Sequence, residues 1–217
     1  MIERFQSEIT TVEALARSVA RPFVPLVGNV DWRFGREYLT TENDIKTISK
    51  RARVGDIILT HTNYNLSNVG IPGFWKHAAF VTGNGYIIEA VRTGVRKRPA
   101  GSLIAGCDYY LLLSPRFADT ARRTKAAGFA ESIIGFPYDK DFRFTISNNV
   151  EFFCSESIWW SYEKTYDQPG QYSPFTPKKV LGVYTIVPQD FANAYWRWEF
   201  KASNRLDKVP HNNVMRG

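Results

Sequence analysis

The sequence predicts an α+β fold in which an antiparallel, barrel-like sheet packs against helices. Strand-like apolar segments follow one another along the chain, at residues 57–60, 77–82, 86–91 and 109–113. The middle two flank Gly83-Asn84-Gly85, whose composition is typical of a hairpin turn. Apolar residues then recur at helical spacing between residues 118 and 134, and a second helix is expected to begin close to Cys154.

The length of 217 residues is enough for one domain with its own hydrophobic core. We expect residues 1–52 to form a helical N-terminal extension, since apolar positions in residues 3–20 are close to helical spacing and a short helix is expected near Thr41. Residues 53–190 are expected to form the main domain, including a last strand at 183–187. Residues 191–217 are expected to form a C-terminal tail, frayed beyond Lys201.

The beginning of the sequence is charged and carries no apolar segment of the kind found in secretory signals. No stretch approaches the length of a membrane-spanning helix. Two cysteines are too few for a disulfide framework. We therefore expect a cytoplasmic protein without a transmembrane segment, and the sequence leaves its oligomeric state open.

The formal net charge is +7, and the basic residues fall in short clusters. A basic balance favours anionic surroundings such as nucleic acid, anionic lipid or an acidic cell-wall polymer. No recognised nucleic-acid-binding motif accompanies the clusters, which are therefore interpreted as a solvated surface. A non-enzymatic nucleic-acid-binding module remains an alternative, although no specific nucleic acid is expected as a partner.

Cys154 is the candidate nucleophile. A thiol attacks as its thiolate, and the unpaired N–H groups at a helix N-terminus lower the pKa of a cysteine placed there. The apolar residues before Cys154 and the helix-compatible residues after it predict this position. Cys107 has no such surroundings and is interpreted as a small buried residue.

A cysteine nucleophile needs a base, and the chain has three histidines. His211 lies in the polar tail, and His61 lies at a strand end, where we interpret it as structural. His77 begins a strand, and the small residues Ala78 and Ala79 after it would let another group come close. His77 is therefore the candidate base.

Glu89 is an acidic residue within an apolar strand, and burying a carboxylate is costly unless it is paired. A three-residue turn at Gly83-Asn84-Gly85 would pair Thr82 with Tyr86. His77 and Glu89 would then be diagonal neighbours on one face of the sheet. The carboxylate could orient the imidazole, whereas a two-residue turn would reverse the parity and separate the two side chains.

A metal site is the rival use of Cys, His and Glu side chains. The sequence has no paired CxxC, no HExxH and no second His at ligand spacing. We therefore expect no metal and no cofactor.

Four short motifs, in order, resemble the permuted branch of the NlpC/P60 (papain-like) superfamily, the YiiX/YebB-like cysteine peptidases. They are the "GDI" strand at 53–59, the histidine strand at 72–79, the "EA…GV" hairpin arm at 86–95, and the "G-x-PYD…CSE" region at 135–156. The resemblance covers roughly residues 53 to 187. The order His, Glu, Cys is the reverse of that in papain and is typical of a circular permutation.

The resemblance implies a circularly permuted papain-like fold and a cysteine peptidase or amidase with a thioester intermediate. It also implies that Tyr138 lines the site and helps to polarise the substrate carbonyl. The aromatic loop at 63–75 could form a wall of the cleft, which makes Tyr64 and Trp75 candidate substrate-binding residues. Peptidoglycan-type peptides are the first substrate class expected. A lipid acyltransferase or thioesterase of the lecithin:retinol acyltransferase-like type is the alternative.

Overall fold

The computed structural model describes residues 35–65, 68, 71–142, 150–167, 177–180 and 183–205. The helix expected in residues 3–20 lies outside these residues. Among the residues that are described, no helix is long and apolar enough to cross a membrane.

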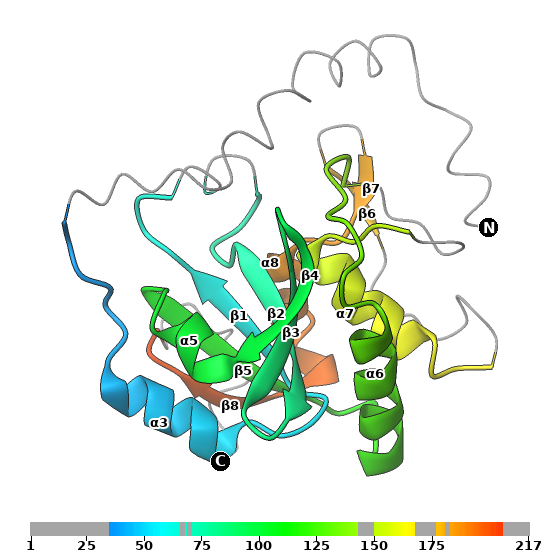
Figure 1. Cartoon of the computed structure of the whole chain (residues 1–217), viewed down its shortest axis with the longest axis horizontal. Coiled ribbons are helices and arrows are strands. Elements are labelled where there is room, and N and C mark those ends of the chain that lie inside the picture. The colour runs from blue at the N-terminus through cyan, green and yellow to red at the C-terminus, as the bar shows by residue number, and fades with distance from the viewer. Residues whose placement is uncertain are drawn as a thin grey trace, which may run out of the picture.

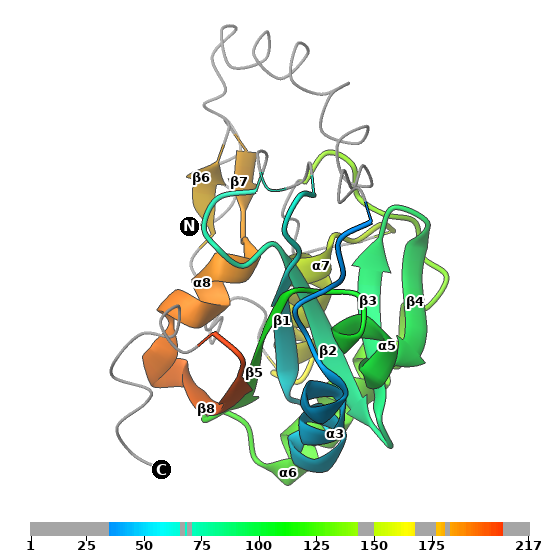
Figure 2. The same ribbon diagram turned by 90° about the vertical axis from the view of Figure 1, so that its left-hand side faces the viewer.

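One six-stranded antiparallel sheet forms the centre of the molecule, with its strands in the order β4-β3-β2-β1-β5-β8 (Figures 1 and 2). The strands are β1 (Ile57–His61), β2 (His77–Gly83), β3 (Tyr86–Val91), β4 (Gly94–Pro99), β5 (Tyr109–Pro115) and β8 (Trp198–Ser203). The short strands β6 (Lys178–Val180) and β7 (Val183–Thr185) form a separate hairpin. The α+β class predicted from the sequence is confirmed.

Helices cover both faces of this sheet. One face packs against α3 (Glu42–Arg51) and α5 (Ala100–Ile104). The other packs against α6 (Thr120–Ser132), α7 (Cys154–Glu163) and α8 (Pro188–Asn193), and a 3₁₀ turn (Tyr195–Arg197) leads into β8. Because both faces are buried, β1 is apolar at consecutive positions, with Ile57 and Leu59 in one core cluster and Ile58 in the other.

The short helix expected near Thr41 is present as α3. Thr41 caps it: its hydroxyl accepts a hydrogen bond from the Asp44 backbone N–H, and the Asp44 carboxylate accepts one from the Thr41 N–H at 2.8 Å. This reciprocal pair is a capping box, which satisfies N–H groups that the first turn of a helix leaves unpaired.

The sequence analysis missed β8, which lies in the segment assigned to a C-terminal tail. Leu111 and Leu112 of β5 pair with Ser203 and Ala202 of β8. The exposed face of β8 carries charged side chains, so its pattern does not stand out as a buried strand. Residues 198–203 are therefore an edge strand of the central sheet.

The turn between β2 and β3 differs from the one expected. Gly83 pairs with Tyr86, which leaves a two-residue turn of Asn84 and Gly85, both with positive φ (+51° and +77°). Asn-Gly is the preferred sequence of such a turn, because both positions need a left-handed backbone. The predicted three-residue turn, with Thr82 paired to Tyr86, is wrong.

A register shift between Val81 and Gly83 compensates for the shorter turn. The shift adds back the residue that the turn lacks, so Phe80 pairs with Ile88, as the sequence predicted. The candidate histidine and glutamate therefore project from the same face, even though the turn itself was predicted incorrectly.

The turn before β1 joins the sheet to α6 and α7. The Gly55 carbonyl accepts a hydrogen bond from the Tyr162 hydroxyl of α7. The carboxylate of Asp56, which has no exposed surface, accepts one from Ser114 at 2.6 Å and lies 3.4 Å from the Arg123 guanidinium of α6. Burial raises the pKa of Asp56, while the hydrogen bonds from Ser114 and the Arg53 N–H act in the opposite direction.

We predict that Gly55→Ala destabilises the protein more than Gly85→Ala does. Both glycines have positive φ, which costs a residue with a side chain about 1–2 kcal/mol. A Cβ at Gly55 would also lie 2.6 Å from Arg123 Cβ, whereas a Cβ at Gly85 would meet nothing within 4 Å. In denaturant unfolding, Gly55→Ala should lower the free energy of unfolding by roughly 1–3 kcal/mol more than Gly85→Ala does. Equal losses would show that the close packing at Gly55 is unimportant.

Candidate active site

Cys154 is the first residue of α7, as the sequence predicted. Phe153 precedes it as the N-cap residue and provides no side-chain hydrogen bond to the helix end. The backbone N–H groups of the first turn therefore remain available, and their partial positive charge favours a thiolate at this point. Cys154 is almost fully buried, with 6% of its surface exposed.

His77 is the first residue of β2, and α7 packs against this strand. The His77 ring and the Ala78 backbone N–H lie close enough to the Cys154 sulfur to lower the pKa of the thiol. Ala78 and Ala79 have no exposed surface. Ala78 projects from the face that α7 covers, and its small side chain allows the helix N-terminus to come close to the strand.

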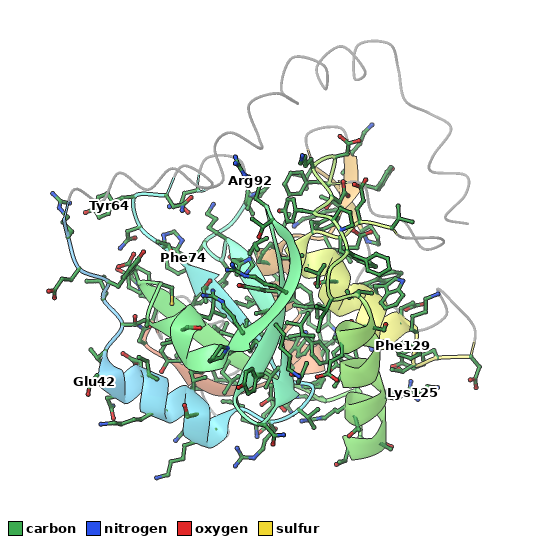
Figure 3. The ribbon with its side chains drawn as sticks, viewed as in Figure 1. Glu42, Tyr64, Phe74, Arg92, Lys125 and Phe129 are labelled. Carbon is green, nitrogen blue, oxygen red and sulfur yellow. The ribbon has the colours of Figure 1, made fainter. Side chains whose placement is uncertain are left out.

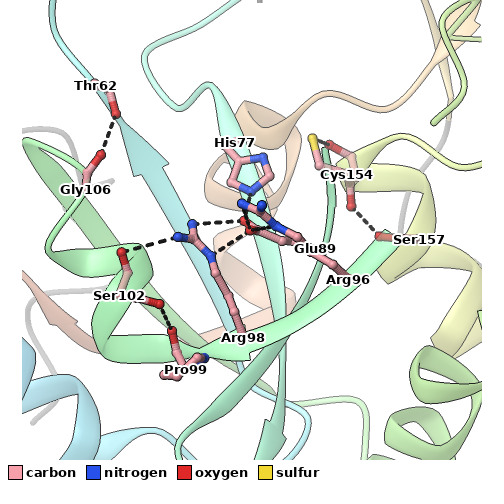
Figure 4. A network of polar contacts seen from close by, with 11 residues as sticks. Thr62, His77, Glu89, Arg96, Arg98, Pro99, Ser102, Gly106, Cys154 and Ser157 are labelled. Atoms are coloured by element: carbon pink, nitrogen blue, oxygen red, sulfur yellow. Dashed lines mark hydrogen bonds and ion pairs between the residues drawn. The ribbon is translucent and has the colours of Figure 1, made fainter. Parts of the chain in front are cut away.

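Glu89 of β3 lies on the other side of the imidazole (Figure 4). His77 Nε2 is 2.8 Å from Glu89 Oε2, and the glutamate side chain has no exposed surface. Because Nε2 faces the carboxylate, Nδ1 is the nitrogen left for the Cys154 sulfur. The three side chains form a line of cysteine, imidazole and carboxylate, which is the order of groups in a nucleophile–base–acid triad.

The electrostatics favour an ion pair between Cys154 and His77. Burial alone would raise the pKa of Cys154, but the hydrogen bond and charge of His77 outweigh it and lower this pKa. Burial alone would lower the pKa of His77, but its contacts with Cys154 and Glu89 raise it to about 10. Below that pH, and above the lowered pKa of Cys154, the pair exists as thiolate and imidazolium.

The sequence analysis missed two partners of Glu89, Arg96 and Arg98 of β4. Arg96 Nε donates a hydrogen bond to Glu89 Oε1 at 2.9 Å, and Arg98 Nη2 donates one to Oε2 at 3.2 Å. Both arginines had been assigned to a solvated basic cluster. Their spacing of two residues in a strand was the available signal, because it places both on the face that carries Glu89.

Tyr138 is near enough to Cys154 for the charge of the sulfur to act on its hydroxyl. The Asp139 N–H donates to the Phe152 carbonyl at 3.1 Å, and the Phe152 N–H donates to the Pro137 carbonyl at 3.0 Å, so this segment is held against the residues that lead into α7. Burial, followed by the nearby charges of Cys154 and Asp139, raises the pKa of Tyr138 well above its ordinary value. Its hydroxyl therefore stays protonated and can donate a hydrogen bond.

Tyr64 and Trp75, the two aromatic residues proposed to form a wall of the cleft, have other surroundings in the structure. Trp75 has no exposed surface and packs in the core, with its ring edge-on to Phe74 at 5.0 Å. Tyr64 is exposed and contacts Arg36, whose guanidinium lies 4.8 Å from the ring centre (Figure 3). Neither residue is brought against Cys154 by the contacts that the structure describes.

Cys107 and His61, the other described cysteine and histidine, have structural surroundings, as the sequence analysis expected. The Cys107 thiol donates to the Ile104 carbonyl at 3.3 Å, and burial raises its pKa, which makes it unreactive. The His61 ring stacks on Phe74 at 4.3 Å, and its Nδ1 lies 2.6 Å from the Phe74 carbonyl. His61 is thus a packed structural residue.

A cysteine at a helix N-terminus, paired with a histidine from an antiparallel sheet, is the arrangement of a papain-like cysteine hydrolase. The family model of permuted papain-like amidase enzymes, the YaeF/YiiX or C92 family, matches residues 51–199. This is more than half of the chain, and the chain belongs to this family. It is therefore a member of an amidase enzyme family.

One solved structure, that of the metalloprotein YiiX from Escherichia coli O157:H7, is similar, with a TM-score of 0.58 and 20% sequence identity. The alignment covers 70% of this chain and 97% of that chain, and at this identity it shows a shared fold alone. Comparison with curated proteins gives no match.

The donor set at this site does not fit a metal ion. Within the described ranges, no group of three or more His, Cys, Asp or Glu side chains could hold one. Both oxygens of Glu89 are already in contact with His77 and the two arginines. A metal ion could be bound by Glu89 only if these contacts were broken.

We predict that Cys154 reacts with iodoacetamide far faster than Cys107 and keeps a high rate well below pH 9. The reason is that contact with His77 lowers the pKa of Cys154, whereas burial raises that of Cys107. Rates measured across pH, with the adduct located by mass spectrometry, test this. An ordinary thiol profile at Cys154, or faster reaction at Cys107, would refute the nucleophile assignment.

Proposed function

We propose that this protein hydrolyses an amide bond, with Cys154 as nucleophile, His77 as general base and acid, and Glu89 as the group that orients His77. The observation that supports this most strongly is the line of contacts from Cys154 through the half-buried His77 to the fully buried Glu89. Membership of an amidase family agrees with it.

The first step is attack of the Cys154 thiolate on the carbonyl carbon of the substrate. The new C–S bond forms as the C=O π pair moves to oxygen, which gives a tetrahedral oxyanion. When this intermediate collapses, the C–N bond breaks and the nitrogen takes a proton from His77 Nδ1. An amine leaves, and the acyl group remains on Cys154 as a thioester.

We assign the stabilisation of this oxyanion to two hydrogen-bond donors. One is the Cys154 backbone N–H at the start of α7, and the other is the Tyr138 hydroxyl. Donors fixed in a water-poor site stabilise a developing charge more than water does, because they need no reorganisation.

The second step regenerates the enzyme. Neutral His77 takes a proton from water, whose oxygen attacks the thioester carbonyl and passes through a second oxyanion. The C–S bond then breaks, which releases a carboxylic acid and returns the thiolate. Glu89 holds the ring in one orientation through both steps, because its hydrogen bond with Nε2 does not need to change.

Peptides are the substrates to test first, and peptidoglycan-type peptides among them. Such peptides carry carboxylates, which suits a chain with a formal net charge of +7.

Several basic side chains have internal partners, which disfavours the nucleic-acid alternative. Arg51 Nη1 donates to the Lys201 carbonyl at 2.6 Å, and Arg123 binds Ser114 and the Pro115 carbonyl. Arg96 and Arg98 contact Glu89. These guanidiniums are therefore not free to bind a phosphate backbone.

We predict that the purified protein releases free amines from peptidoglycan fragments or small peptide amides. Cys154→Ala and His77→Ala should each reduce the rate by at least about a thousandfold, because either change removes the activated nucleophile. Cys107→Ala is the matched control and should retain activity. If peptides stay inert while phospholipid leaves an acyl group on Cys154, the enzyme is an acyltransferase instead.

We predict that Tyr138→Phe lowers kcat by roughly a hundredfold, because it removes one oxyanion donor and keeps the ring. The rate of Cys154 alkylation should change little, since that reaction forms no oxyanion. Tyr86→Phe, a change at an exposed tyrosine of the β2–β3 hairpin, is the control. An unchanged kcat in Tyr138→Phe would remove Tyr138 from the mechanism.

A further inference from the structure

We infer that Arg96 and Arg98 are positioning residues that act on the catalytic pair through Glu89. This inference rests on the proposed function of Cys154 and His77. It extends the functional unit from three residues to five, and it assigns a role to two cations that family membership and sequence pattern leave unexplained.

The two guanidiniums contact both oxygens of the Glu89 carboxylate (Figure 4). Arg96 reaches Oε1 through Nε at 2.9 Å and through Nη2 at 2.8 Å. Arg98 places Nε 2.6 Å from Oε1 and donates from Nη2 to Oε2 at 3.2 Å. His77 Nε2 completes the set at 2.8 Å from Oε2.

The burial of Glu89 explains why these partners are needed. A carboxylate with no exposed surface pays a large desolvation cost and would otherwise take up a proton. Burial does act to raise the pKa of Glu89, but His77, Arg98 and Arg96 outweigh it and lower this pKa to about 2. Glu89 is therefore held as an anion that accepts a hydrogen bond from His77.

The backbone of β4 fixes both arginines. Arg96 pairs with Glu89 across the β3–β4 ladder, and Arg98, two residues on, projects from the same face. Arg98 Nη1 also donates to the Ser102 carbonyl of α5 at 3.3 Å. Lys97, between them, projects from the opposite face and pairs with Glu131 of α6 at 2.5 Å.

The charges that face Glu89 come from three elements. His77 is on β2, the two arginines are on β4, and Cys154 on α7 lies beyond His77. With the thiolate and imidazolium formed, two negative and three positive charges are close together. Because the arginines hold Glu89 as an anion, Glu89 stabilises the imidazolium, and the imidazolium favours the thiolate over the thiol.

The arginines thus have two effects on the chemistry. They keep Glu89 in one position, so that Nε2 of His77 stays bound and Nδ1 stays aimed at Cys154. They also lower the pH at which Cys154 becomes a thiolate. A purely structural ion pair on this strand would produce neither effect.

The test measures the pH profile of Cys154 alkylation for Arg96→Gln and Arg98→Gln. Loss of one cation raises the pKa of both Glu89 and Cys154, so the acid limb of the profile should move upward by about one pH unit. Lys97→Gln and Arg92→Gln are matched controls that remove a cation from the same strand and from the β3–β4 turn. Both should keep the wild-type profile, and thermal unfolding should confirm that each variant is folded.

A second set of variants tests whether the arginines act through Glu89. Arg98→Lys should recover part of the shift, because it keeps the charge but loses the planar contact. In a Glu89→Gln background, Arg96→Gln should cause a much smaller further shift than it does in the wild type. This background also removes the buried charge, so it can be measured if the single arginine variants do not fold.

The outcomes separate this inference from the proposed function. An ordinary thiol profile in the wild type would defeat the proposed function itself. A low thiol pKa in the wild type that is unchanged in folded Arg96→Gln and Arg98→Gln would refute the role of the arginines alone. Equal shifts with and without Glu89 would show that the arginines do not act through it.

Discussion

A fully buried carboxylate, Glu89, is the constraint on which the arrangement of the site depends. An isolated charge without exposed surface is too costly to keep, so the fold must bring cations to it. It does so from two strands: His77 comes from β2, and two arginines come from β4. The contacts of Glu89 therefore link β2, β3 and β4 through their side chains.

This contact set also joins the two faces of the sheet. Ile87 of β3 packs in the core beneath α3 and α5, and Glu89 is on the same face by strand alternation. Cys154 begins α7, which packs on the opposite face. The imidazole bridges the two because His77 is the first residue of β2, at the end of the strand, where a side chain can reach both faces.

The α7 side of this arrangement depends on the turn before β1. The contact of Gly55 with Tyr162 fixes α7 against the sheet, and Asp56 links the same turn to α6. The "GDI" motif is therefore explained by helix docking, which sets where the nucleophile lies, and not by direct participation in the chemistry. The hydrogen bonds between residues 137–139 and Phe152 fix Tyr138 in a similar way.

The sequence by itself determined the α+β class, and it placed the cysteine at a helix start, the histidine at a strand start and the glutamate in a buried position. These features follow from local pattern: the spacing of apolar residues and a single charged residue within an apolar strand. The predicted pairing of His77 with Glu89 also held, although the reason given for it was wrong. A two-residue turn and a register shift cancel each other, and the short-range pattern does not show the register shift.

Tertiary structure alone decided the rest. The partners of Glu89 were missed because the two-residue spacing of Arg96 and Arg98 shows that they share a face of the strand, but not whether that face meets water or a buried carboxylate. The tail strand β8 was missed because its burial comes from pairing with β5, about ninety residues earlier in the chain. Trp75 was expected at the cleft and lies in the core. In each case the outcome depends on which surface a side chain meets after folding, and contacts between distant segments set that.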